Sequence, residues 1–244
     1  MVSAEAGAVS MATTTFISHP FFRCAVAGAA LLALSACSSG MGAAVQSLRE
    51  LLPQPTRADA TKLDPELEYL RVTRGKHVAL LWRGSVERAD GAPVDVYYSG
   101  QGEVVRLQNG RIVGASGLPT EWRRVEIKAP SWSTVAGSPE RARVVRVRDV
   151  MPGYVSGLRE DLALRRVAAP ERSALRGVDA KSLAWFEERV SSAVPAAQQL
   201  PTARYAVDLA KGEGTVVYAE QCLAADLCFT WQRWSEAMQQ AALQ

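Results

Sequence analysis

The side chains with the clearest chemistry are the cysteines, of which the sequence has four. Two of them, Cys222 and Cys228, are separated by five residues. In an oxidising compartment such a pair forms a disulfide, and closing so short a loop contributes on the order of 2 kcal/mol. The spacing does not fit a Cys-x-x-Cys redox or zinc motif, and no histidine is near. We therefore expect a structural Cys222–Cys228 bridge.

Cys37 ends a segment that has the form of an export signal. About eleven apolar residues follow Arg23 and close on Leu34-Ser35-Ala36-Cys37. The run is shorter than the roughly 20 residues that cross a bilayer. Its ending resembles the lipobox of bacterial lipoproteins, which implies that Cys37 is acylated, with palmitate among its chains. The alternative is a buried helix with an incidental cysteine. A start at Met11 gives a cleaner signal, because the preceding residues include Glu5 and no basic residue.

The predicted organisation follows from this signal. Residues 1–36 are the signal peptide, 37–62 a lipidated anchor and linker, and 63–244 a β-rich periplasmic domain. Ser38 is not the aspartate that retains lipoproteins in the inner membrane, so the outer membrane is expected. Several acyl chains make such anchoring effectively permanent.

Charge excludes few partners. The formal net charge is +3, which suits acidic glycans or phospholipid headgroups without requiring them. No block of Lys and Arg is dense enough to predict nucleic-acid binding. The expected partners are the membrane, an envelope protein and an acidic polysaccharide.

Catalysis is not predicted. Nucleophilic catalysis needs a base, and His77, the histidine that remains after the signal, opens a strand as a surface residue would. Glu187 and Glu188 are a candidate glycosidase pair, but adjacent strand residues point to opposite faces. No phosphate-binding loop, metal site or cofactor is expected.

Binding by stacking and charge remains open. Aromatic platforms for sugar rings and arginines for acidic groups are the candidates, with core packing as the alternative for the rings. These candidate contact residues are Tyr97, Tyr98, Trp122, Trp132, Arg106, Arg111 and Arg124.

Short alternating segments predict an all-β fold, an antiparallel sandwich or partly open barrel built of hairpins with a short C-terminal helix. Asn109-Gly110 between β-branched runs is the strongest hairpin signal, since a type I′ turn needs positive φ at both positions. In the segment 141–148 arginine and valine alternate so that the inward face switches at Val144-Val145. Residues 183–190 show helical spacing at Leu183, Phe186 and Val190 as well as strand-like alternation, and we favour a strand. Residues 229–242 are predicted to form a helix.

Several segments together resemble the YjbF/GfcB family of lipoproteins. They are Tyr69-Leu70-Arg71-Val72, Val78-Ala79-Leu80-Leu81, Asn109-Gly110-Arg111-Ile112-Val113 with Gly117-Leu118-Pro119, Arg204-Tyr205-Ala206-Val207-Asp208 and Gly214-Thr215-Val216-Val217-Tyr218-Ala219-Glu220-Gln221, after the lipobox at Cys37. The resemblance implies a role in group 4 capsule or exopolysaccharide export. It predicts a non-enzymatic assembly or interaction factor on the periplasmic face of the outer membrane. A periplasmic glycan-binding or glycan-processing domain is the alternative.

Overall fold

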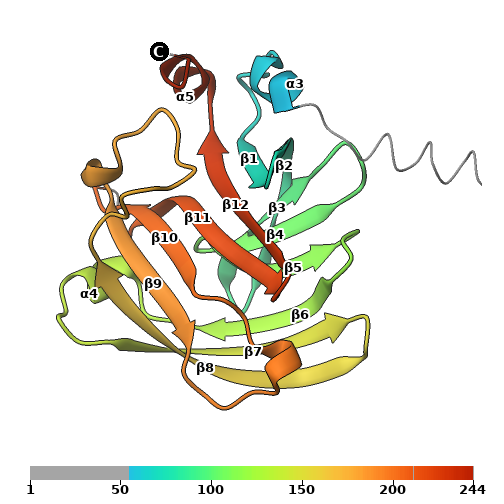
Figure 1. Ribbon diagram of the computed structural model, residues 1–244, viewed down its shortest axis with the longest axis vertical. Coiled ribbons are helices and arrows are strands. Elements are labelled where there is room, and N and C mark those ends of the chain that lie inside the picture. The colour runs from blue at the N-terminus through green and yellow to red at the C-terminus, as the bar shows by residue number, and fades with distance from the viewer. Residues whose placement is uncertain (1–54, 211, 244) are drawn as a thin grey trace, which may run out of the picture. The chain divides into compact units, whose positions relative to one another are not determined.

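The computed structural model describes residues 55–210 and 212–243, which form a closed antiparallel β-barrel (Figure 1). The predicted signal peptide, Cys37 and most of the predicted linker lie outside the described residues. The barrel has twelve strands: β1 (Tyr69–Arg74), β2 (His77–Ala89), β3 (Ala92–Tyr98), β4 (Val104–Gln108), β5 (Arg111–Ser116), β6 (Glu121–Lys128), β7 (Ala142–Met151), β8 (Val155–Val167), β9 (Ala184–Val190), β10 (Ala203–Asp208), β11 (Thr215–Ala224) and β12 (Leu227–Trp234). The helices are short: α3 (Pro55–Ala60), α4 (Trp132–Ala136) and α5 (Glu236–Ala241), with 3₁₀ turns at Ala180–Ser182 and Ala196–Gln198. Among the described residues, no helix combines the length and the apolar character needed to cross a membrane.

The closure of the barrel corrects the predicted fold class. Each strand pairs with its neighbours in the chain, and β1 pairs with β12 from Tyr69↔Trp234 to Thr73↔Thr230. All-β structure is confirmed, but a sandwich or partly open barrel is wrong. The first strand pairs with the last through residues about 160 positions apart, and local sequence patterns contain no information on such distant pairing.

The last strand also corrects the predicted C-terminal helix. Residues 227–234 form β12, and only α5 is helical. Trp231 and Trp234 point to opposite faces of β12, yet both are buried, at 1% and 4% exposure. A strand that is buried on both faces loses the alternation that identifies a strand, so the tryptophan spacing resembled a helical stripe.

The predicted Asn109-Gly110 turn and the predicted strand at 183–190 are confirmed. Asn109 and Gly110 join β4 to β5 with φ of 49° and 77°, and β9 spans Ala184–Val190. Gly110 also lies against β11, where an added Cβ would be 2.3 Å from Cγ2 of Val216. This hairpin therefore requires glycine for its conformation and for its packing.

The outer face of the barrel is covered over five strands. Register aligns one buried row across β1, β12, β11, β10 and β9, formed by Arg71, Gln232, Tyr218, Ala206 and Trp185. Residues 168–183, which we call the strap, connect β8 to β9 (Figure 1). The strap packs against the outside of this buried row. Backbone groups of the strap meet the row through hydrogen bonds of Ala174 N to Tyr218 Oη (3.1 Å), Arg176 N to Gln232 Oε1 (3.0 Å) and Trp185 Nε1 to Ala180 O (2.8 Å).

The segment that joins the linker to the barrel is held by charge and hydrogen bonds. Asp59 in α3 accepts two hydrogen bonds from Arg71 in β1, at 2.6 and 2.9 Å. Gln239 in α5 donates to the carbonyls of Asp59 and Thr61. α3 and the residue that follows it are therefore fixed to β1 and to the C-terminal helix α5.

Candidate functional site

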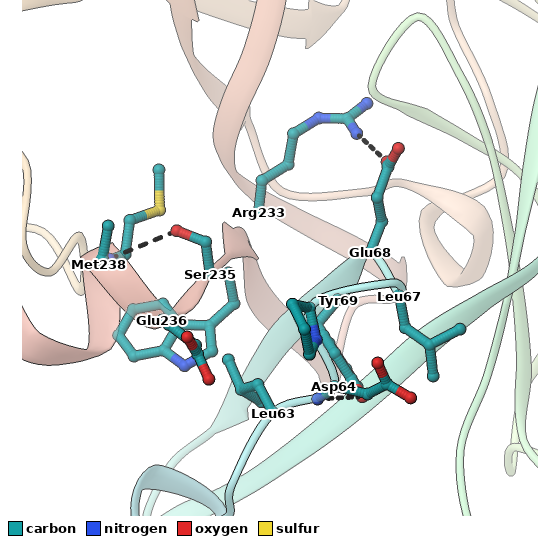
Figure 2. A pocket seen from close by; sticks show the side chains of 12 residues that line it. Leu63, Asp64, Leu67, Glu68, Tyr69, Arg233, Ser235, Glu236 and Met238 are labelled. Carbon is teal, nitrogen blue, oxygen red and sulfur yellow. Dashed lines mark hydrogen bonds and ion pairs between the residues drawn. The ribbon is translucent and has the colours of Figure 1, made fainter.

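An open groove of about 470 Å³ lies at one end of the barrel (Figure 2). It separates the arm that enters β1 from the arm that leaves β12. Its lining residues are Leu63, Asp64, Pro65, Leu67, Glu68, Tyr69, Arg233, Trp234, Ser235, Glu236, Ala237 and Met238. The groove is thus formed by the residues that lead into β1 and those that follow β12.

The two arms diverge because each turns as soon as strand pairing ends at Tyr69↔Trp234. On one side Asp64 forms a turn, accepting from the backbone N–H of Glu66 at 2.9 Å. On the other, Ser235 caps α5 by accepting from the N–H of Met238 at 3.3 Å. In the Asp64 turn and in the Ser235 cap alike, the acceptor is the side-chain oxygen of a residue type that favours turns and helix starts. The groove is therefore a consequence of local sequence at both arms.

The groove has an apolar base and a charged rim. Leu63 and Trp234 are buried, whereas Leu67 is 40% exposed. The Nε1 of Trp234 is buried and has no hydrogen-bond partner among the described residues. Asp64 and Glu236 are exposed and acidic. This combination suits an apolar group accompanied by a positive charge.

Ion pairs close the mouth of the barrel beside the groove. Glu68 pairs with Arg83 at 2.5 Å and with Arg233 at 3.6 Å, the second being drawn in Figure 2. Asp95 pairs with the same two arginines, at 3.3 and 3.4 Å. Arg233 also contacts the hydroxyl of Tyr97, whose pKa burial raises to about 12. This end of the interior is filled by charged side chains that satisfy one another.

The interior holds a second set of charges, on the segment for which a switch of the inward face was predicted. The predicted switch of the inward face at Val144-Val145 does not occur, and Val144, Arg146, Arg148 and Val150 all point inward. A β-bulge is present in the β7–β8 pairing, but it lies beyond Arg148. The signal that would have found these inward arginines is Glu160 on β8, the strand paired with β7, because a buried arginine needs a carboxylate partner.

Glu160 lies between the two inward arginines. Its carboxylate accepts from Arg146 Nε at 2.7 Å and from Arg148 Nε at 2.9 Å, and it is fully buried. Burial raises the pKa of Glu160, but the two guanidinium groups outweigh it and hold the pKa below its usual value. Burial lowers the pKa of Arg148, against the opposing effect of Glu160. Both guanidinium groups also lie over the ring of Trp122, at 5.0 and 4.9 Å.

Arg111 and Glu188 form the other interior pair. Arg111 Nε donates to Glu188 at 2.8 Å, and its guanidinium lies 4.0 Å from the ring centroid of Trp132. Tyr205 Oη lies 3.4 Å from Glu188 and 3.3 Å from Gln221. Burial, followed by the charge of Glu188, raises the pKa of Tyr205. The cavity beside this network is about 10 Å³, the space of roughly one water molecule.

The structure separates the candidate contact residues into interior and surface groups. Tyr97, Trp122, Trp132 and Arg111 are buried at 0–3% exposure inside the barrel, where an external partner does not reach them. Trp122 and Trp132 direct their Nε1 groups to the carbonyls of Leu223 and Asn109. The three aromatic rings therefore pack in the core, which was the alternative to sugar stacking.

The remaining candidates lie on the outer surface without forming one site. Tyr98 is half-buried on the outer face, and its ring packs so closely on Gly84 that a Cβ there would be 2.6 Å from Cε2. Arg106 pairs with Glu87 and Arg124 with Glu126, both at exposed positions. Trp82 on β2 is also 36% exposed.

The residues that could have served in catalysis, His77, Glu187 and Glu188, also do not form one site. His77 is exposed at the start of β2. Glu187 and Glu188 do point to opposite faces of β9, with Glu187 outside between Arg165 and Arg204 and Glu188 inside. Among residues 55–210 and 212–243 there is no group of three or more His, Cys, Asp or Glu side chains arranged to hold a metal. Cys222 and Cys228 face each other in the β11–β12 hairpin and form a disulfide, with Cα atoms 3.9 Å apart.

Comparison with solved structures finds a weak likeness. The chain is similar to the crystal structure of the hypothetical lipoprotein YmcC from Escherichia coli (K12), with a TM-score of 0.49 and 17% sequence identity over 78% of this chain and 93% of that chain. No protein-family model and no curated protein matches the sequence. A similarity at this level assigns neither a family nor a function to the chain.

Proposed function

We propose that this protein is an exported, lipid-anchored, non-enzymatic assembly or interaction factor in capsule or exopolysaccharide export. We place it on the periplasmic face of the outer membrane. The observation that carries the proposal is the filled barrel. Trp132, Tyr205, Phe186 and the buried Arg–Glu pairs occupy the interior, so recognition takes place on the outer surface.

The membrane anchor is supported by sequence. Leu34-Ser35-Ala36-Cys37 follows a short apolar run and resembles a lipobox, and the first described element, α3, begins eighteen positions after Cys37. The export role is supported by the resemblance of the hairpin segments to the YjbF/GfcB lipoproteins. α3, the first described element after Cys37, is fastened to the barrel by Asp59 and Arg71.

The groove is the surface that we assign to the protein partner. Its occupant would be an extended segment that places an apolar side chain over Leu63 and Leu67, with a Lys or Arg beside it. The exposed carboxylates of Asp64 and Glu236 complement that charge. The partner is an envelope protein of the export system.

Complementation of a deletion strain tests this function. The gene is deleted, and wild-type protein, Cys37→Ser or Leu67→Asp is supplied, while surface polysaccharide is quantified. We expect deletion to abolish surface polysaccharide and wild type to restore it. Both variants should fail, because one lacks the tether and the other places a charge in the groove. Val86→Asp is the matched control, since Val86 is 53% exposed and does not line the groove.

The outcomes separate the parts of the proposal. Normal surface polysaccharide in the deletion strain would exclude the export role. Full complementation by Leu67→Asp would exclude the groove as the partner site, and an unmodified Cys37 thiol in the mass spectrum of the mature protein would exclude the lipid anchor. Loss of function in Val86→Asp as well would show that any surface charge disturbs the protein.

A further inference from the structure

A second concavity, of about 490 Å³, lies on the outside of the barrel between the β1–β2 turn and the strap. Its lining residues are Asp59, Arg71, Thr73, Gly75, Lys76, Val78, Ser173, Ala174, Leu175 and Arg176. Three of these are cationic and one is acidic. The net charge of the lining is therefore positive, with the hydroxyl groups of Thr73 and Ser173 beside it.

The cations of this concavity differ in how they are engaged. Arg71 is 4% exposed and is held by Asp59 through two hydrogen bonds and by the Thr73 hydroxyl at 2.9 Å. The side chains of Lys76 and Arg176 form no ion pair within the part of the chain that the structure describes. Lys76 and Arg176 thus border the concavity without a direct ion pair, although the charge of Arg176 also helps to lower the pKa of Asp59.

The wall that carries Arg176 is fixed in place. The buried amide of Gln232 accepts from the backbone N–H of Arg176 at 3.0 Å and donates to its carbonyl at 2.7 Å. The hydroxyl of Tyr218 accepts from the N–H of Ala174 at 3.1 Å. The strap therefore holds its backbone at a set distance from β1, which keeps the concavity open.

We propose that this concavity binds an oxyanion, either the carboxylate of an acidic glycan or the phosphate of a lipid headgroup. Lys76 and Arg176 would contact the ligand, with hydrogen bonds from Thr73 or Ser173. Asp59 is the built-in competitor, because its carboxylate already occupies the guanidinium of Arg71 and its side chain is 27% exposed. A ligand that displaced Asp59 would gain the paired donors of Arg71 and would loosen α3.

This site goes beyond the proposed export role and does not depend on it. The groove that we assign to a protein partner has a different lining and an acidic rim, whereas this concavity is basic. Failure of the complementation test would leave the anion site intact, and failure of anion binding would leave the groove intact.

Titration of the full chain in detergent micelles tests the site. The probes are inorganic phosphate, glycerol phosphate and a trigalacturonate, with maltotriose as the neutral control, and binding is followed by calorimetry. We expect saturable binding of an anionic probe and none of maltotriose. Lys76→Gln and Arg176→Gln should each weaken binding about tenfold, the usual effect of losing one charge-assisted hydrogen bond. Lys128→Gln, a change at an exposed lysine on β6, should bind as wild type does.

Asp59→Asn gives a result of opposite sign. Removal of the competing carboxylate should tighten saturable anion binding, because it frees the guanidinium of Arg71 and makes the lining more positive. Preference for trigalacturonate identifies a glycan as the source of the anion, and preference for glycerol phosphate identifies a headgroup. Absence of saturable binding would overturn the proposal. So would wild-type affinity in both Lys76→Gln and Arg176→Gln, or equal weakening in Lys128→Gln.

Discussion

At the scale of single residues, the most consequential feature is the pair of arginines that share one buried carboxylate. Arg146, Arg148 and Glu160 are at most 7% exposed, and Glu160 lies within hydrogen-bonding distance of both. Desolvation of three charges is costly, and hydrogen bonds and Trp122 offset part of that cost. A buried network of this kind stabilises the fold only while it is complete.

Replacement of Glu160 by Gln should therefore be strongly destabilising. The change leaves two buried guanidinium groups without a counter-charge, and we expect a loss of about 3–5 kcal/mol in the free energy of unfolding. Urea denaturation measures it. Glu126→Gln removes the partner of the exposed Arg124 and should cost less than about 1 kcal/mol. Equal and small losses in both variants would show that the interior pair carries no net charge interaction.

Asp59 gives a pH-dependent prediction at the same scale. Its hydrogen bonds with Arg71 hold its pKa below the ordinary value, so its contribution to stability is present above that value and is lost as pH falls through the folded-state pKa. Wild type should be more stable than Asp59→Asn at pH 7. The difference in the free energy of unfolding should begin to shrink below about pH 4, the pKa of an unfolded Asp, and should vanish below the folded-state pKa. Denaturation of both proteins between pH 7 and pH 2.5 measures the difference. A gap that persists unchanged at low pH would contradict this linkage.

At the scale of elements, turn chemistry was predictable and burial on two faces was not. Asn109-Gly110 and Asp90-Gly91 adopt positive φ as their residue types require, since these conformations depend on only two residues. The predictions for β12 and β7 are wrong because residues distant in the sequence determine which faces of these strands are buried. The strap and α5 cover the outside of β12, and Glu160 neutralises the inside of β7. Periodicity assumes a polar outer face and an apolar inner face, but β12 is buried on both faces and the inner face of β7 carries arginines.

The two tight turns offer a matched test of local strain against packing. Gly110→Ala and Gly91→Ala both place a Cβ at positive φ, which costs about 1–2 kcal/mol. An added Cβ at Gly110 also meets Val216 at 2.3 Å, whereas nothing lies within 4 Å at Gly91. We expect Gly110→Ala to lose about 1–3 kcal/mol more, the usual effect of overpacking, in thermal or urea unfolding. Equal losses would mean that β11 moves freely away from the hairpin.

At the scale of the whole molecule, closure decides what the candidate site can be. Hairpins, and hence an all-β chain, could be predicted from local alternation, but the seam between β1 and β12 joins the two ends of the domain. Closure removes sheet edges as docking surfaces and brings the arms of Leu63–Tyr69 and Arg233–Met238 together. The groove and the basic concavity therefore could not be predicted from sequence, because each combines segments that are far apart in the chain.

The seam should make the barrel unfold as one unit. Leu70 in β1 is fully buried in the core that the other strands share, so Leu70→Ala should cost about 2–5 kcal/mol. Because β1 holds both β2 and β12, tryptophan fluorescence and far-ultraviolet circular dichroism should shift together to lower urea. Leu67→Ala, at a 40% exposed groove position, should cost less than about 1 kcal/mol. Separate transitions in the two signals of Leu70→Ala would show instead that β1 detaches while the remaining strands persist, and the closed barrel would then not be a single cooperative structure.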